Sequence, residues 1–183
     1  GVPHPFVGPG GEVPSEEDYR ELVIGQSGLA GLSVTRKVFV PLEGYFLRYL
    51  DVLENPGTEP ITVDVVVDSQ LKSDALVVAT ASGDAAVDAS DSWVVLDDAE
   101  ARDIYDAADP DQEFTPWAVT VQGAGGLPPS SRTLTGATLT DRWNGVVVGP
   151  GETVAFLHLL SGQTDRARGQ ASAERLALLP PEV

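Results

Sequence analysis

The two histidines, His4 and His158, belong to the residue type that most often carries acid–base chemistry near neutral pH. His4 lies in a proline-rich stretch at the start of the chain. His158 alternates with Phe156 and Leu160 in a strand-like run, which predicts a histidine packed in the core. No GxSxG-type nucleophile turn and no cysteine accompanies these histidines. The sequence therefore predicts no catalytic residues, no Ser-His-Asp triad and no zinc site.

Acidic side chains are numerous, so a carboxylate pair of the kind that glycoside hydrolases use is an alternative. Its members would be Asp97, Asp98 and Glu113, which lie where a strand-like run passes into the longest irregular stretch of the chain. Because acidic residues are spread over the whole sequence, solvated carboxylates that maintain solubility are the simpler interpretation. The sequence favours a protein that is not an enzyme.

The same irregular stretch, residues 97–116, contains a candidate calcium site. Calcium takes roughly six to eight oxygen ligands, and two short acidic segments of this stretch bring such oxygens close together. Neither segment follows the residue order of an EF-hand loop. The candidate ligands are Asp97, Asp98, Asp109, Asp111 and Glu113. No other cofactor is expected.

Aromatic residues raise the question of carbohydrate recognition, because exposed rings stack on sugars. Trp93 and Trp117 lie in strand-like runs with apolar neighbours, so core packing is the expected use of both. Trp143 precedes an Asn-Gly pair and Tyr105 lies in the acidic stretch, where exposure is easier. Trp143 and Tyr105 are therefore the candidate sugar-binding residues.

Charge restricts the partners of this chain. It carries 28 acidic and 11 basic residues among its 183, a formal net charge of −17 at pH 7. Such a surface repels phosphate backbones and anionic lipid, so we expect no nucleic-acid binding and no membrane insertion. No apolar run approaches the ~20 residues that cross a bilayer. Cysteine is absent from the chain, which excludes disulfides and thiolate chemistry.

The stretch from Tyr45 to Leu71 organises the predicted fold. Two strand-like runs flank a loop with the sequence NPGTEP, which sets turn geometry and discourages helix. The second run alternates apolar and polar side chains with a period of two. The sequence predicts a β-hairpin here, and three successive antiparallel strands over residues 33–40, 45–54 and 61–71. The middle strand is apolar on both faces, so it should lie centrally in its sheet.

Further strands are predicted at residues 76–80, 85–88, 93–96, 117–122, 132–140, 146–148 and 152–160, and a helix at 164–179. The predicted fold class is mainly β, an antiparallel β-sandwich with one C-terminal α-helix. The chain divides into an irregular Pro/Gly-rich lead-in (1–30), a β-sandwich domain (31–162), and a C-terminal helix with a Pro-rich end (163–183).

In pattern the chain resembles a β-sandwich module of large bacterial secreted or surface multidomain proteins. The runs that carry this resemblance are GLSVTRKVFVPLEGYFLRYLDVLENPGTEPITVDVVVDSQLKSD, TASGDAAVDASDSWVVLDD and GPGETVAFLHLLSGQTDRARGQASAERLALLPPE. The resemblance implies an Ig-like or larger sandwich, outside the bacterial cytoplasm, that holds or presents neighbouring domains. No catalytic residues are carried over with it.

We therefore expect a non-enzymatic structural, adhesion or spacer module of a larger bacterial extracytoplasmic protein, secreted or at the cell surface. The alternative is a carbohydrate-binding module of a secreted enzyme. The expected partners are neighbouring domains of a longer chain, together with a glycan or a protein surface.

Overall fold

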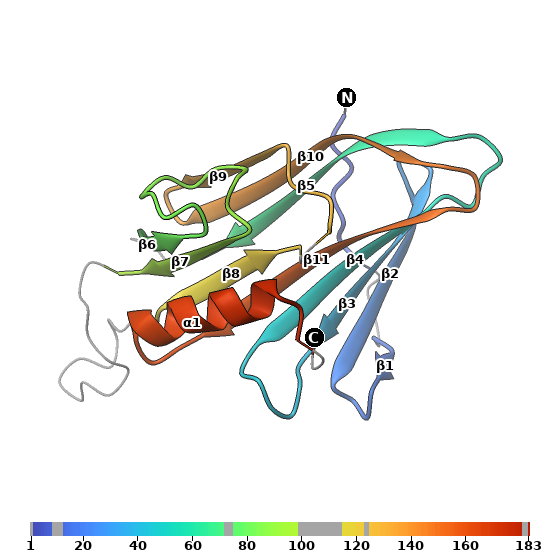
Figure 1. Ribbon diagram of the computed structural model, residues 1–183. Helices are drawn as coiled ribbons and strands as arrows, with labels where there is room; N and C mark the ends of the chain where they lie inside the picture. Colours follow the sequence, from blue (N-terminus) through green and yellow to red (C-terminus); the bar gives the residue numbers. More distant parts are fainter. Residues whose placement is uncertain (1, 9–12, 72–74, 99–114, 123–124, 181–182) are drawn as a thin grey trace.

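In a computed structural model the chain forms two packed β-sheets and one helix (Figure 1). The structure describes residues 2–8, 13–71, 75–98, 115–122, 125–180 and 183. Sheet A has eight strands in the order β1 (Ser15–Glu16), β2 (Glu21–Leu29), β3 (Leu32–Phe39), β4 (Leu47–Glu54), β11 (Thr153–Gly162), β8 (Trp117–Val121), β7 (Trp93–Asp97) and β6 (Leu76–Thr80). Sheet B has three strands in the order β5 (Ile61–Gln70), β10 (Thr138–Val148) and β9 (Ser131–Thr135).

All strand pairs in the two sheets are antiparallel, and α1 (Arg166–Ala177) follows the last strand. The predicted fold class, a mainly β antiparallel sandwich with one C-terminal helix, is confirmed. An arrangement of eight and three strands corresponds to the larger of the two sandwich forms that the resemblance implied. No helix in the described ranges is long and apolar enough to cross a membrane.

The core lies between the inner faces of the two sheets. On β5 the inward residues Val63, Val65 and Val67 alternate with exposed ones, as a half-buried strand requires. They pack with a buried cluster drawn from both sheets: Leu32, Val34, Leu53, Trp143, Val146, Val148 and Phe156. A second cluster continues this core toward β6: Val94, Leu96, Val119 and Leu139.

The predicted hairpin between residues 45–54 and 61–71 was wrong, because β5 belongs to the opposite sheet. β4 pairs with β3 along one edge and with β11 along the other, so neither edge is free to receive β5. The chain instead crosses from sheet A to sheet B through residues 55–60, and β5 pairs with β10. The predicted pairing of the first two strands and the central position of β4 were confirmed.

Asn55 fixes this crossing between the sheets. Its side chain is fully buried, and Nδ2 donates to the carbonyl oxygens of Glu59 (2.8 Å) and Val148 (2.9 Å). Oδ1 accepts a hydrogen bond from the backbone N–H of Gly57 at 2.9 Å. The backbone N–H of Asn55 donates to Glu152. One side chain therefore ties the crossing to the turn between β10 and β11.

Asn55→Ala is expected to lower the free energy of unfolding by about 2–3 kcal/mol, because the buried carbonyl of Val148 loses its donor and the crossing loses two further bonds. Urea unfolding followed by tryptophan fluorescence measures the change. Asn144→Ala is the matched control, since the Asn144 side chain is exposed at the irregularity of β10 between Trp143 and Val146, and should change stability by less than about 0.5 kcal/mol. Equal losses in the two variants would contradict this role of Asn55.

The predicted irregular lead-in over residues 1–30 was wrong for its second half. Residues 21–29 form β2, which pairs with β3 along its length. The hairpin turn places Ala30 and Gly31 at φ +53° and +89°, and positive φ at both central residues is the type I′ geometry that suits twisted strands. The glycines at 25, 28 and 31 therefore belong to a strand and its turn, and the described residues 2–8 form an arm without regular structure.

Two further strand predictions needed correction. The strand predicted over residues 132–140 is divided by a turn at Gly136 (φ +57°) into β9 and the start of β10. Residues 85–88 form no strand. They lie in a loop held by the buried carboxylate of Asp91, which accepts hydrogen bonds from the backbone N–H groups of Ser82 (2.9 Å) and Asp88 (3.1 Å).

The predicted C-terminal helix is confirmed with narrower bounds. Its N-cap is Asp165, whose side chain accepts a hydrogen bond from the backbone N–H of Arg168 at 2.8 Å. The helix lies on the outer face of sheet A over β7, β8 and β11 (Figure 1). Gly169 allows close approach, since a Cβ at this position would lie 3.0 Å from the side chain of Val95.

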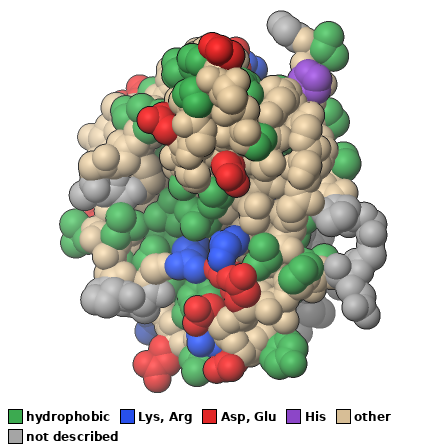
Figure 2. Space-filling view, turned by 90° about the vertical axis from the view of Figure 1, so that its right-hand side faces the viewer, with side chains coloured by type: hydrophobic (Ala, Val, Ile, Leu, Met, Phe, Trp, Pro, Cys, Tyr) green, Lys and Arg blue, Asp and Glu red, His purple; other side chains and the backbone are tan. Residues whose placement is uncertain are grey.

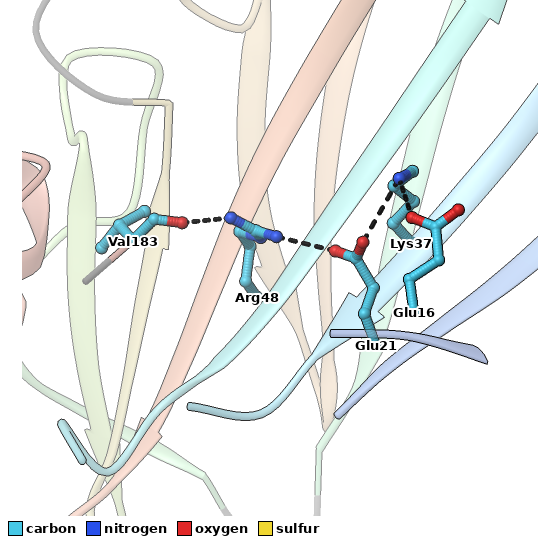
Figure 3. A network of polar contacts seen from close by, with 5 residues as sticks. All are labelled: Glu16, Glu21, Lys37, Arg48 and Val183. Carbon is cyan, nitrogen blue, oxygen red and sulfur yellow. Dashed lines mark hydrogen bonds and ion pairs between the residues drawn. The ribbon is translucent and has the colours of Figure 1, made fainter. Parts of the chain in front are cut away.

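A chain of ion pairs links β1, β2, β3 and β4 on this outer face (Figure 3). Glu21 is buried and contacts Arg48 at 2.7 Å and Lys37 at 3.2 Å. Lys37 also contacts Glu16 at 2.7 Å, and Arg48 donates to the backbone oxygen of Val183. Burial opposes the charged form of Glu21, yet the hydrogen bonds from Arg48 and Lys37 lower the pKa of its carboxyl. The network links the side chain of the edge strand β1 to β3, and links the last described residue, Val183, to β4.

Candidate functional site

Polar side chains gather on the inner face of sheet A. Cross-strand pairing aligns Arg36 (β3), Asp51 (β4) and Phe156 (β11) in one row of this face. The next row contains Tyr49 (β4) and His158 (β11). Directly paired residues of a sheet project from the same face. The fold therefore brings together an arginine, a carboxylate, a phenol and a histidine from three neighbouring strands.

The Arg36 guanidinium neutralises the carboxylate of this group. Nε lies 2.6 Å from Asp51 Oδ1, and the second nitrogen donates to Oδ2 at 2.8 Å, a two-point pair. The hydrogen bonds that Arg36 donates to the Asp51 carboxylate raise the pKa of Arg36. The Phe6 ring of the N-terminal arm stacks over Arg36, with 5.5 Å between the guanidinium carbon and the ring centroid. The Asp51 carboxylate is therefore paired with Arg36, and the N-terminal arm covers Arg36.

The inner-face histidine is closed to solvent. His158 is 5% exposed, and its ring meets the Trp143 ring edge-on at 5.7 Å between centroids. Among the described residues neither ring nitrogen has a hydrogen-bond partner. Burial lowers the pKa of His158 to about 4, so the ring is neutral at pH 7. A histidine without a carboxylate or carbonyl to orient it is poorly equipped for acid–base catalysis. The predicted core role of His158 is confirmed.

A second charged pair, Arg132 (β9) and Asp141 (β10), lies between the sheets. Their side chains are 0% and 1% exposed, and Arg132 Nε lies 3.1 Å from Asp141 Oδ1. The guanidinium also donates to the carbonyl oxygens of Asp91 (2.8 Å) and Val119 (3.2 Å). Burial lowers the pKa of Arg132 and raises the pKa of Asp141, although each charge favours the other. Neither residue lines the cavities described below.

The larger cavity is a groove on the outer side of the molecule, with a volume of about 660 Å³. One wall is residues 42–45 of the β3–β4 loop, and the other is α1 with the segment that precedes it. We call it the α1 groove, lined by Leu42, Glu43, Gly44, Tyr45, Gln163, Arg168, Ala171, Ser172 and Arg175. Tyr45 and Leu42 are 87% and 85% exposed at its rim. This groove combines an aromatic ring, apolar surface and charged donors.

The predicted sugar-binding tryptophan lies elsewhere. Trp143 is 2% exposed, packs against Phe156 with 4.8 Å between ring centroids, and donates from Nε1 to the Leu127 carbonyl at 3.0 Å. Its expected exposure was wrong, because its neighbours place it on the inner face of β10. The cavity beside it has a volume of about 180 Å³, below the roughly 300–1,000 Å³ of typical ligand pockets. Tyr105 lies outside the described residues.

Of the candidate calcium ligands, the structure describes two. Asp97 is buried at the end of β7, with its carboxylate 2.5 Å from Arg166 Nε of α1. The carbonyl of Asp98 accepts from the same guanidinium at 2.9 Å. Asp109, Asp111 and Glu113 lie outside the described residues. Within the described ranges no three acidic or histidine side chains come together as a metal site. Asp97 is placed to bind α1, and calcium binding stays a prediction.

Sequence reasoning missed the α1 groove. Tyr45 was expected inside a strand, whereas β4 begins at Leu47 and Tyr45 occupies the loop before it, at φ +52°. The preceding Pro41-Leu42-Glu43-Gly44 run predicted a turn. An aromatic residue directly after such a turn was the available signal.

No protein-family model matches the chain, and no curated protein sequence does. Solved structures match it. An α-galactosidase from Lactobacillus brevis is 11% identical with a TM-score of 0.54 over 82% of this chain and 24% of that one. A polysaccharide lyase is 10% identical with a TM-score of 0.53 over 88% of this chain and 24% of that one.

A third match is an Escherichia coli K12 protein to which an aldose 1-epimerase activity is ascribed, 9% identical with a TM-score of 0.52. The match covers 84% of this chain and 68% of that one. The likeness is one of fold. This chain spans about a quarter of the α-galactosidase and of the lyase, and so corresponds to one domain-sized part of each.

Proposed function

We propose that this chain is a non-catalytic accessory β-sandwich domain of a larger protein that handles carbohydrate. The observation that carries the proposal is the state of the polar group on the inner face of sheet A. Asp51 is held by Arg36, Phe6 covers that pair, and His158 is buried without a partner among the described residues. A sugar-converting site needs an acid and a base within reach of substrate. Here both groups are engaged or enclosed.

The solved structures support the larger-protein part of this proposal. Two of the matching proteins bear carbohydrate-active names, and this chain spans about a quarter of each. A sandwich that forms one part of such an enzyme can serve as a spacer or a support for its neighbours. Location outside the bacterial cytoplasm belongs to the proposal as well, as the resemblance to modules of bacterial secreted or surface proteins implies.

The surface charges fit a carbohydrate or protein partner better than a nucleic acid. On the side of the molecule seen in Figure 2, lysine and arginine side chains lie among acidic ones and form no basic patch. Several of the basic side chains are engaged in ion pairs, such as Lys37 with Glu16 and Arg48 with Glu21. Nucleic-acid binding needs unopposed cations along a groove or face.

The purified chain is expected to leave the mutarotation of α-D-glucose and α-D-galactose at the buffer rate, measured by polarimetry at pH 7. Neutral His158 is 5% exposed and Asp51 is paired, so neither can exchange protons with a bound sugar. Hydrolysis of nitrophenyl glycosides should likewise equal the blank.

The control is His158→Asn, which removes the only imidazole on the inner face of the described sheet. It should give the same rates as the unaltered chain. Acceleration by the unaltered chain that His158→Asn abolishes would show an enzyme and refute the proposal. A carbohydrate-binding role, the alternative from the sequence, is favoured by a different region, the α1 groove.

A further inference from the structure

We propose that the α1 groove binds a neutral saccharide, with the Tyr45 ring as its stacking platform. The groove lies on the outer side of sheet A, away from the inner-face polar group. In Figure 1 the β3–β4 loop that forms one wall emerges next to α1, which forms the other. The site goes beyond an accessory role, since it gives the domain a ligand of its own.

The Tyr45 ring contributes little to the packing of the fold. It is 87% exposed, so the ring gains little from burial. Its φ of +52° is an uncommon conformation for a bulky residue and costs on the order of 1–3 kcal/mol. A glycine would satisfy the turn without that cost. An exposed ring kept at a strained position, at the rim of a groove, is a feature that a stacking ligand would use.

The backbone beneath the ring is fixed by its neighbours. Ser161 Oγ donates to the Tyr45 carbonyl at 2.7 Å, and the Arg175 guanidinium donates to the Gly44 carbonyl at 3.1 Å. Ser161 is itself held by Gln163 Nε2 at 2.7 Å and by Ser172 Oγ at 2.9 Å. Phe46, the next residue, is 4% exposed and packs with Leu159 and Leu176. The ring therefore stands on a rigid support, which limits the ordering cost of binding.

The polar groups of the groove suit hydroxyl groups better than a charged ligand. Arg168 supplies donors, Glu43 supplies an acceptor, and Gln163 offers its amide oxygen, since its Nε2 donates to Ser161. Arg168 lies 3.5 Å from Asp165, so the four charges around the groove sum to zero. The chain as a whole carries −17 and would repel a polyanion. Neutral sugar hydroxyls, which donate and accept, match this set.

The groove also has the size of a ligand site. Its volume of about 660 Å³ falls within the roughly 300–1,000 Å³ of small-molecule pockets. Tyr45 and Leu42 are exposed at the rim, so a sugar unit of a longer polymer can reach the Tyr45 ring from solvent. We therefore expect a segment of a polysaccharide as the ligand.

The test is affinity electrophoresis of the whole chain in native gels that contain β-glucan, galactomannan or pullulan, with alginate as the anionic comparison. At least one neutral polymer should retard the protein, and alginate should not. Tyr45→Ala should weaken that retardation about tenfold or more, since loss of one aromatic contact is worth roughly a factor of ten. Ala171→Leu, which narrows the groove from α1, should weaken it as well.

Tyr19→Ala is the matched control. Tyr19 is 88% exposed at φ +65°, the same residue type in the same backbone region, yet it does not line the groove. It should leave the retardation unchanged, and circular dichroism should show all variants folded. The proposal is overturned if no neutral polymer retards the chain, if only alginate does, or if Tyr45→Ala and Tyr19→Ala behave alike.

Discussion

Asp141→Leu is expected to lower the free energy of unfolding by about 3–5 kcal/mol, the largest loss from a single substitution foreseen for this chain. The substitution keeps the branched shape of the side chain with two methyl groups in place of the two oxygens, and leaves the Arg132 guanidinium, 0% exposed, without its carboxylate. A buried arginine cannot escape by losing its proton near neutral pH. Urea unfolding at pH 7 measures the change.

The double substitution Arg132→Met with Asp141→Leu separates the cost of an orphaned charge from the value of the pair. With both charges gone, the core should recover most of the loss and lie within about 2 kcal/mol of the unaltered chain. The remaining difference reflects the hydrogen bonds from Arg132 to the carbonyls of Asp91 and Val119. If the double variant were as unstable as the single one, the charge pair would not be the cause.

Stability is expected to fall by roughly 3 kcal/mol between pH 7 and pH 4 on account of His158 alone. Burial lowers the pKa of this histidine from 6.5 in the unfolded chain to about 4 in the folded one. Between pH 6.5 and about pH 4 the unfolded state binds a proton at His158 and the folded state does not. Stability therefore rises with pH in this window and is fully present above pH 6.5.

His158→Leu isolates this contribution, because other groups such as Glu21 also titrate in acid. The difference in unfolding free energy between the unaltered chain and His158→Leu should shift by roughly 3 kcal/mol from pH 7 to pH 4. His4→Leu, in the exposed N-terminal arm, is the control for the substitution itself and should leave the free energy of unfolding at pH 7 unchanged. Parallel pH profiles for His158→Leu and the unaltered chain would contradict the assignment.

These two predictions concern groups that the fold encloses, and both bear on function. The inner face contains a buried ion pair and a neutral histidine that has no hydrogen-bond partner among the described residues. These polar groups are part of the core of the fold. The groove proposed as a ligand site is on the other side of sheet A, where Tyr45 lies beside α1. The structure thus separates a closed interior from an open groove.

The sequence by itself determined the local elements wherever side-chain alternation or capping chemistry was strong. Val63, Val65 and Val67 predicted β5, and the Ala- and Leu-containing run after Asp165 predicted α1. Alternation around His158 also predicted a core histidine, because neighbours two residues apart share a face of a strand. These signals lie within about ten residues of chain and need no knowledge of the partner.

Only the tertiary structure decided which strands pair. The NPGTEP loop fits a hairpin or a crossing between sheets equally well, and the choice depends on β11, about a hundred residues away, which occupies the second edge of β4. Arg132 likewise meets the carbonyls of Asp91 and Val119, which lie 41 and 13 residues away in the chain, and Tyr45 lies beside a helix more than about a hundred residues further on. Pairing partners and grooves are long-range properties, because they arise from competition for edges and faces among all the strands at once.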